Sequence, residues 1–184
     1  MKIIFLDIDG VLNSQLWYSK RRNFNTEDVD EHYPFYEFDP DAITQLNRIV
    51  KETNAKIVIS STWRIGRTIE ELQDILNKVG FEGEVIDITI SFGGIKGYTI
   101  PRGCEIEHWL KSKNFQRINW SKEVQSDFIE KSGVSNYIIL DDDSDMLYKQ
   151  REHFIQTTNN TGLDKKIADK AIDTLNKSLI DLYY

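Results

Sequence analysis

The chain has 184 residues, of which 40% are hydrophobic, and this suits a single domain with a buried core. Its 23 basic and 30 acidic residues give a net charge of −7 at pH 7, which disfavours bulk attraction to nucleic acid but leaves room for a local basic patch. The single cysteine, Cys104, excludes an internal disulfide. We find neither a secretory leader nor an apolar run of the roughly 20 residues that span a bilayer. We therefore expect a soluble cytoplasmic protein without a membrane partner.

The first predicted element is a buried strand that ends in two acids. Residues 3–6 are all apolar, as in a parallel strand buried on both faces, and the run stops at Asp7. Asp7 and Asp9 are therefore expected at the carboxyl end of a strand, where open α/β sheets bind ligands, and Gly10 lets the backbone turn away. Neighbouring carboxylates repel each other unless a cation or a proton accounts for them, so the pair suggests chemistry. A plain polar turn is the alternative, whereas a calcium loop is excluded because apolar residues stand where its further oxygen ligands are needed.

Residues 13–38 show neither helical nor strand periodicity. We expect an irregular connection, and loops of this length in compact domains are often functional lids. Within it, Trp17 and Tyr18 precede three basic residues at 20–22. Such a group can stack a base and hold a phosphate, and the alternative is an amphipathic loop with a solvated charged face.

A helix and a second strand come next. Asp39 is a good N-cap with proline after it, and apolar residues then recur at helical spacing to about Thr53. The β-branched run at 56–60 predicts a strand parallel to the first. Three hydroxyls and an arginine follow it and are placed to bind an anion beside the first strand: Ser60, Ser61, Thr62 and Arg64.

The middle of the chain continues this alternation. Thr68 and Glu71 form a capping box for a helix, and residues 84–90 predict a third strand. The glycine-rich residues 91–98 lack the spacing of a nucleotide-binding loop and are interpreted as a turn. Arg102 begins the following helix.

The last third contains a dense group of acids. After a polar surface extension at 113–132, the apolar residues 137–140 predict a buried strand, and four acids follow within residues 141–145. Residues 153–156 are expected to form a short fifth strand and residues 164–177 a closing helix. The alternation predicts one α/β domain with a parallel sheet flanked by helices.

Polar groups follow the ends of three strands that are far apart in sequence. In a parallel sheet these ends meet at one edge, so the acids of the first and fourth strands are expected to share a site with the hydroxyls of the second. Only oxygen ligands are available there. This favours Mg²⁺, a hard cation bound by carboxylates and a substrate phosphate, over zinc.

These motifs, in this order, resemble the haloacid dehalogenase (HAD) superfamily of phosphatases. The resemblance covers nearly the whole chain and rests on DIDGV at 7–11, the Ser/Thr step, a basic residue that opens a helix, and a DD pair after a late strand. SSTWR at 60–64, RGCEIEHWL at 102–110 and ILDDDSDM at 139–146 look most like the small HAD domains found with RNA-repair enzymes. The resemblance implies a Rossmann-like HAD-type fold over residues 1–184 with a minimal cap, in which residues 13–38 take the cap position.

The resemblance also implies roles for the acids. Asp7 would attack phosphorus to form an aspartyl-phosphate, and Asp9 would protonate the leaving oxygen and later activate water. Asp7 and the backbone carbonyl of Asp9 would bind Mg²⁺, and Asp141 or Asp142 would complete the protein ligands.

Further roles are carried over to polar and basic residues. Ser60, or else Ser61, would bind the phosphoryl oxygens, and Arg102 would take the place usually filled by lysine, with Lys96 and Lys111 as alternatives. Arginine is a planar fork, so this is a departure from the family pattern. The candidates for substrate contact are Gly10, Ser61, Thr62 and Arg64.

The resulting hypothesis is a Mg²⁺-dependent phosphomonoesterase acting on nucleotides or on terminal phosphates of nucleic acid, because the short insertions leave the site open to a large substrate. No obligate protein partner is indicated. The alternatives are a receiver-like phosphoacceptor domain, which would however carry its acceptor aspartate on a middle strand, and a HAD-like binding module without catalysis.

Overall fold

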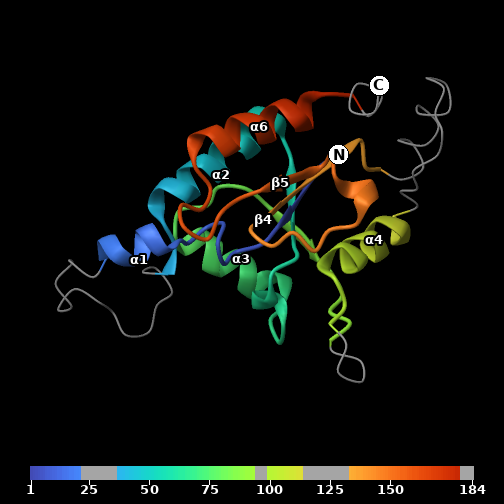
Figure 1. Ribbon diagram of the computed structural model, residues 1–184, viewed down its shortest axis with the longest axis horizontal. Helices are drawn as coiled ribbons and strands as arrows, with labels where there is room; N and C mark the ends of the chain where they lie inside the picture. The colour runs from blue at the N-terminus through green and yellow to red at the C-terminus, as the bar shows by residue number, and fades with distance from the viewer. Residues whose placement is uncertain (22–36, 94–98, 114–132, 179–184) are drawn as a thin grey trace.

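Five parallel strands form one sheet in the order β3-β2-β1-β4-β5 (Figure 1). The computed structural model describes residues 1–21, 37–93, 99–113 and 133–178. The strands are β1 (Lys2–Leu6), β2 (Lys56–Ile59), β3 (Val85–Ile88), β4 (Asn136–Asp141) and β5 (Phe154–Gln156). The predicted α/β fold with a parallel sheet is confirmed.

The register of the sheet brings the ends of the central strands to one level. Leu6, the last residue of β1, pairs with Ile59 on one side and with Leu140 on the other. The residues that follow these positions therefore leave the sheet side by side. This is the physical basis for a site built from segments more than 130 residues apart.

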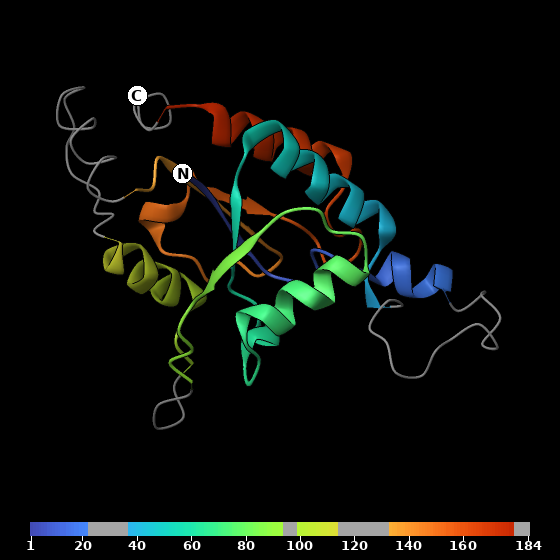
Figure 2. The same ribbon diagram turned by 180° about the vertical axis from the view of Figure 1, so that it is seen from behind.

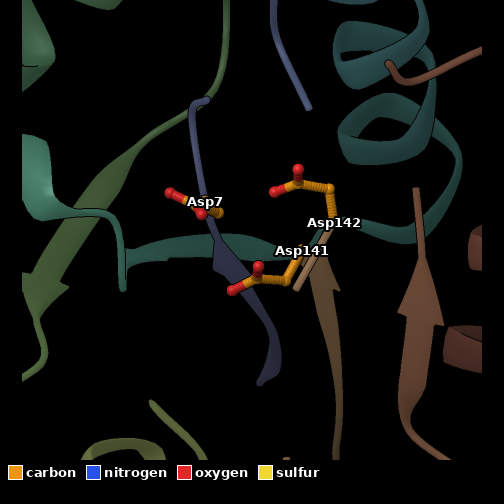
Figure 3. Close-up of side chains that lie close together, drawn as sticks. All are labelled: Asp7, Asp141 and Asp142. Atoms are coloured by element: carbon orange, nitrogen blue, oxygen red, sulfur yellow. The ribbon is translucent and has the colours of Figure 1, made fainter. Parts of the chain in front are cut away.

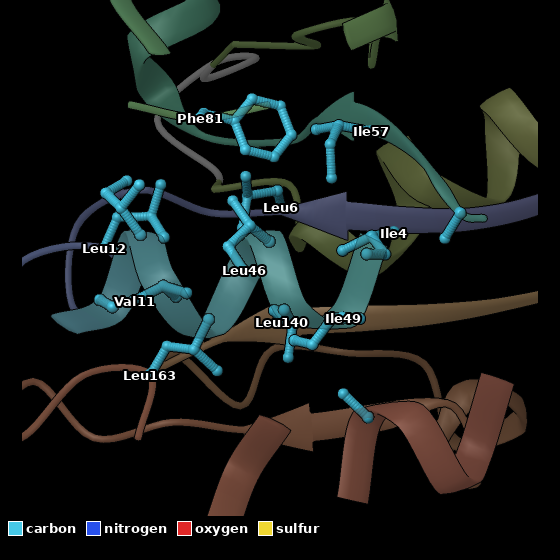
Figure 4. Close-up of a cluster of buried hydrophobic side chains, with 14 of the residues drawn as sticks. Ile4, Leu6, Val11, Leu12, Leu46, Ile49, Ile57, Phe81, Leu140 and Leu163 are labelled. Carbon is cyan, nitrogen blue, oxygen red and sulfur yellow. The ribbon is translucent and has the colours of Figure 1, made fainter. Parts of the chain in front are cut away.

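Helices cover both faces of the sheet and bury two separate apolar clusters. α2 (Pro40–Thr53) and α6 (Lys165–Asn176) lie side by side on one face, and α3 (Ile69–Lys78) packs into the same cluster (Figures 1 and 2). Side chains of α2 lie against those of β1 and β4 within that cluster (Figure 4). α4 (Arg102–Ser112) packs on the other face, where Trp109 meets Phe5 edge to face at 5.2 Å.

The predicted helix starts are confirmed by their caps. Asp39 accepts a hydrogen bond from Asp41 N, and Asp164 accepts one from Ile167 N. Thr68 and Glu71 form the full capping box, in which each side chain bonds the other residue's backbone N–H. Among the described residues, none of the helices combines the length and apolar character needed to cross a membrane.

One prediction in the cap position is wrong. Residues 13–38 were expected to be irregular, but α1 (Gln15–Arg21) is a short helix. Ser14 Oγ accepts from Trp17 N at 3.1 Å, and Gln15 N and Leu16 N donate to the carbonyls of Asn159 and Asn160, so a local cap and a contact from the far end of the chain both fix its start. Local periodicity carries no trace of such a contact. The remaining cap residues 22–36 and most of the predicted extension, residues 114–132, lie outside the described residues.

Candidate active site

Three carboxylates meet at the ends of β1 and β4. They belong to Asp7, Asp141 and Asp142, and one oxygen from each lies within 4.8 Å of the others (Figure 3). Asp7 and Asp141 are buried, and Asp142 is half-buried. The topology therefore brings together three of the acids that the sequence predicted to share a site, and the side chain of Asp9 is not among them.

Backbone contacts hold this acidic trio in place. Asp7 Oδ1 accepts from Ile8 N at 2.8 Å, and Asp141 Oδ1 accepts from Asp143 N at 2.9 Å. Gly10 lies under the Asp142 carboxyl group with φ +69°, and a Cβ atom there would stand 2.3 Å from Asp142 Cγ. The glycine of the first motif thus makes room for an acid of the last, rather than only allowing a turn.

The trio is electrostatically unfavourable without a cation. Burial and the charge of Asp7 raise the pKa of Asp141 to about 8, and the same two causes raise the pKa of Asp142. Asp141 Oδ2 is buried and accepts no hydrogen bond from the described part of the chain. A buried oxygen that accepts no hydrogen bond and has a single ion-pair contact, next to two further carboxylates, fits a hard divalent cation.

Arg102 supplies the positive charge of the site. As the first residue of α4, it places Nε 3.2 Å from Asp141 Oδ2 and Nη1 3.4 Å from Asp7 Oδ1. Burial alone would lower the pKa of Arg102, but Asp7, Asp141 and other nearby acids outweigh it and raise the pKa. The start of α4 is fixed because Arg102 N donates to Asp145 Oδ2 at 2.8 Å.

The two lysines considered for this role do not compete within the described structure. Lys111 pairs with Glu107 at 3.4 Å and its side chain is 60% exposed near the other end of α4. Lys96 lies outside the described residues.

The hydroxyls after β2 separate into three environments. The Ser60 carbonyl accepts from Arg102 Nη1, and Ser60 Oγ is buried without a hydrogen-bond partner in the ranges that the structure describes, so this hydroxyl has unused bonding capacity. Ser61 Oγ instead accepts from Trp63 N at 3.4 Å and caps the short helix η3 (Thr62–Arg64). Thr62 is exposed. Of the two serines, the geometry favours Ser60 for an anion.

The comparison with protein families agrees with this arrangement. A model described as the HAD domain in Swiss Army Knife RNA repair proteins matches residues 3–168. The chain belongs to this family. The match runs from β1 into α6 and so includes every residue of the trio. Neither the curated proteins nor the solved structures gave a match to the chain.

In this HAD domain Arg64 is a structural residue, which corrects the prediction that it contacts substrate. Its guanidinium is buried and all five N–H donors are used. They bond the carbonyls of Ser60, Ser61, Thr89 and Ile90 and, at 2.6 Å, the Glu105 carboxylate. Arg64 therefore ties the ends of β2 and β3 to α4. It leaves no donor for a phosphate.

Asp9 stands apart from the HAD domain's trio. It is exposed, its Oδ1 accepts from Asn13 Nδ2 at 2.9 Å, and its Oδ2 accepts from Trp63 Nε1 at 3.1 Å. Its side chain is thus directed to other partners, and its predicted metal contact through the backbone carbonyl stays a prediction. No role for Asn13 or Trp63 was predicted from the sequence. The one signal was that Trp63 lies inside the SSTWR motif.

Proposed function

We propose that this HAD domain is a Mg²⁺-dependent phosphomonoesterase that works through an aspartyl-phosphate. The observation that carries the proposal is the buried trio of carboxylates paired with Arg102, because such a group has little use except to hold a cation and an anion together. The family match supports the same class of chemistry.

The trio supplies the protein ligands for the metal. Asp7, Asp141 and Asp142 offer carboxylate oxygens only, which suits Mg²⁺. When bound, Mg²⁺ would offset the repulsion between the phosphate and these carboxylates and polarise the phosphoryl group.

The protein side chains divide the reaction into two displacements. Asp7 attacks phosphorus, the bond from phosphorus to the leaving oxygen breaks, and Asp9 gives that oxygen its proton. Asp9 then takes a proton from the water that attacks the aspartyl-phosphate, which releases inorganic phosphate and restores Asp7. Arg102 and Ser60 bind the phosphoryl oxygens, since one carries a fixed charge and the other an unused hydroxyl.

The substrate class that we propose is the terminal phosphate of a nucleotide or polynucleotide. It rests on the family to which the domain belongs, whose members are found in RNA repair proteins. Comparing mononucleotides with oligonucleotides that carry a 3′- or a 5′-phosphate tests it. Equal, very low rates with every nucleotide, beside rapid turnover of a sugar phosphate, would contradict this substrate class.

Phosphate release is expected to require the metal. The protein with Mg²⁺ should liberate inorganic phosphate from an aryl phosphate monoester, and excess EDTA should abolish the release because the trio then repels the substrate. Adding Mg²⁺ back should restore the rate, which controls for damage by the chelator. Metal-independent release at the full rate would overturn the mechanism.

Stabilisation by Mg²⁺ is expected to grow with pH. The folded protein holds a proton on Asp141 up to about pH 8, whereas the unfolded chain loses it near an ordinary carboxyl pKa. The stability of the metal-free protein therefore falls as pH rises between roughly pH 4 and pH 8. Mg²⁺ binds the carboxylate form, so protons compete with it below pH 8.

Thermal unfolding with and without Mg²⁺ checks this expectation. The shift of the midpoint should be clearly larger at about pH 8.5 than at about pH 6. Calorimetry at the lower pH should also detect proton release on metal binding. A shift that is the same at both pH values would show that Asp141 is not a competing proton site.

A further inference from the structure

The carboxyl group of Asp9 is held at both oxygens by side chains outside the metal trio. Trp63 Nε1 donates to Oδ2 at 3.1 Å, and Asn13 Nδ2 donates to Oδ1 at 2.9 Å. Each carboxyl oxygen has a second lone pair, so these bonds leave it able to carry a proton. An exposed aspartate with two side-chain donors is restrained far more than an ordinary surface carboxylate.

The indole ring of Trp63 is itself fixed by its surroundings. Phe38 meets the ring edge to face at 5.3 Å, and the Arg67 guanidinium lies 5.4 Å from its centroid. Arg67 also donates to the Trp63 carbonyl at 2.8 Å, while Ser61 caps the Trp63 backbone N–H. The ring is thus already engaged by protein groups. Its polar N–H is the part directed at the site.

Asn13 is anchored in a similar way. Its Oδ1 accepts from Gly10 N at 2.8 Å, which orients the amide so that Nδ2 faces Asp9. The donor to one oxygen of Asp9 therefore belongs to the same loop as Asp9. The donor to the other oxygen comes from η3, after the neighbouring strand β2.

We propose that Trp63 is a positioning residue that orients the Asp9 carboxyl group toward the leaving oxygen. The inference rests on the proposed function, in which Asp9 donates the proton. Without the indole N–H, the Asn13 bond alone leaves the carboxyl group free to turn about its side-chain bonds. Proton donation then loses its geometry, although Asp7 and the trio are untouched.

A role in packing alone predicts a different result. If Trp63 only supports η3, its loss should slow all substrates to the same extent. If it orients a proton donor, the loss should grow as the leaving group becomes poorer, because a good leaving group departs without protonation. Phenyl phosphate and 4-nitrophenyl phosphate differ in this property and little in shape. The parameter kcat/KM reports the step in which the leaving group departs, and not the later attack of water.

The experiment compares Trp63→Phe with wild type on these two substrates. Phenylalanine keeps a ring against Phe38 but removes the N–H. We expect kcat/KM for phenyl phosphate to fall about 10- to 100-fold, and that for 4-nitrophenyl phosphate to fall less than about threefold. Trp109→Phe is the matched control, since it removes the indole bond to Asp87 Oδ2 at 2.9 Å, and it should leave the ratio of the two values unchanged.

A second variant guards against a folding defect. Asn13→Ala removes the bond to the other oxygen of Asp9 and should change the same ratio in the same direction. If the ratio stays at the wild-type value in both variants while wild type turns over both substrates, the positioning role is wrong and the proposed function stands. If wild type turns over neither substrate, the proposed function fails and takes this inference with it.

Discussion

Asp7→Asn is expected to reduce phosphate release by at least about 10³-fold, to the limit of detection in a standard assay. The amide cannot form the aspartyl-phosphate, and the change also removes one of the three negative charges that would attract the metal. Steady-state release of phosphate from 4-nitrophenyl phosphate measures the loss. Because asparagine at this position cannot accept a phosphoryl group, a phosphorylated substrate should also fail to label the variant protein.

Loss of folding does not explain the expected result. Asp7 is one of the causes that raise the pKa values of Asp141 and Asp142, so neutralising it relieves repulsion in the metal-free protein. The variant should therefore unfold at the same temperature as wild type or higher. Asp143→Asn is the matched control, since it makes the same change at an exposed acid beside the trio and should retain activity. Full activity in the Asp7 variant would refute covalent catalysis by this residue.

The parts of the fold that depend on interactions between residues close together in the chain could be predicted from the sequence. The caps at Asp39, Thr68 and Asp164 follow from side-chain bonds to backbone groups two or three residues away. The apolar runs of β1, β2 and β4 indicated buried parallel strands, and topology then brought Asp7 to Asp141 and Asp142. The acidic half of the site was predictable because strand ends converge by geometry.

Contacts between separate segments could not be predicted in this way. Arg64 follows a strand among polar residues, which is typical of an exposed position, and its partners are backbone carbonyls after β3 and a carboxylate on α4. The bond from Trp63 to Asp9 likewise depends on the spacing between neighbouring strand ends. The residues next to Arg64 and Trp63 in the sequence do not indicate these contacts, so both roles could be recognised only from the structure.

Because Arg64 bonds groups from three elements, its replacement is expected to lower the stability of the protein strongly. Arg64→Met is expected to lower the free energy of unfolding by about 3–5 kcal/mol, because it leaves Glu105 as a buried charge without its cation and orphans several carbonyl oxygens. For a domain of this size the unfolding midpoint should fall by roughly 6–20 °C, measured by calorimetry or circular dichroism. Arg67→Met serves as the control, since that arginine is exposed and its loss should cost about 1 kcal/mol or less.

A double variant separates the two causes of that loss. In Arg64→Met the Glu105 carboxylate keeps one partner, Phe92 N at 3.0 Å, and Glu105→Gln preserves an acceptor for that bond while it removes the uncompensated charge. Arg64→Met with Glu105→Gln should therefore be more stable than Arg64→Met alone, by about 1–3 kcal/mol. If the double variant is no more stable, the orphaned carbonyls after β2 and β3 dominate the loss. If Arg64→Met itself unfolds like wild type, the guanidinium does not hold these strand ends to α4, and the assignment of Arg64 as a structural residue is wrong.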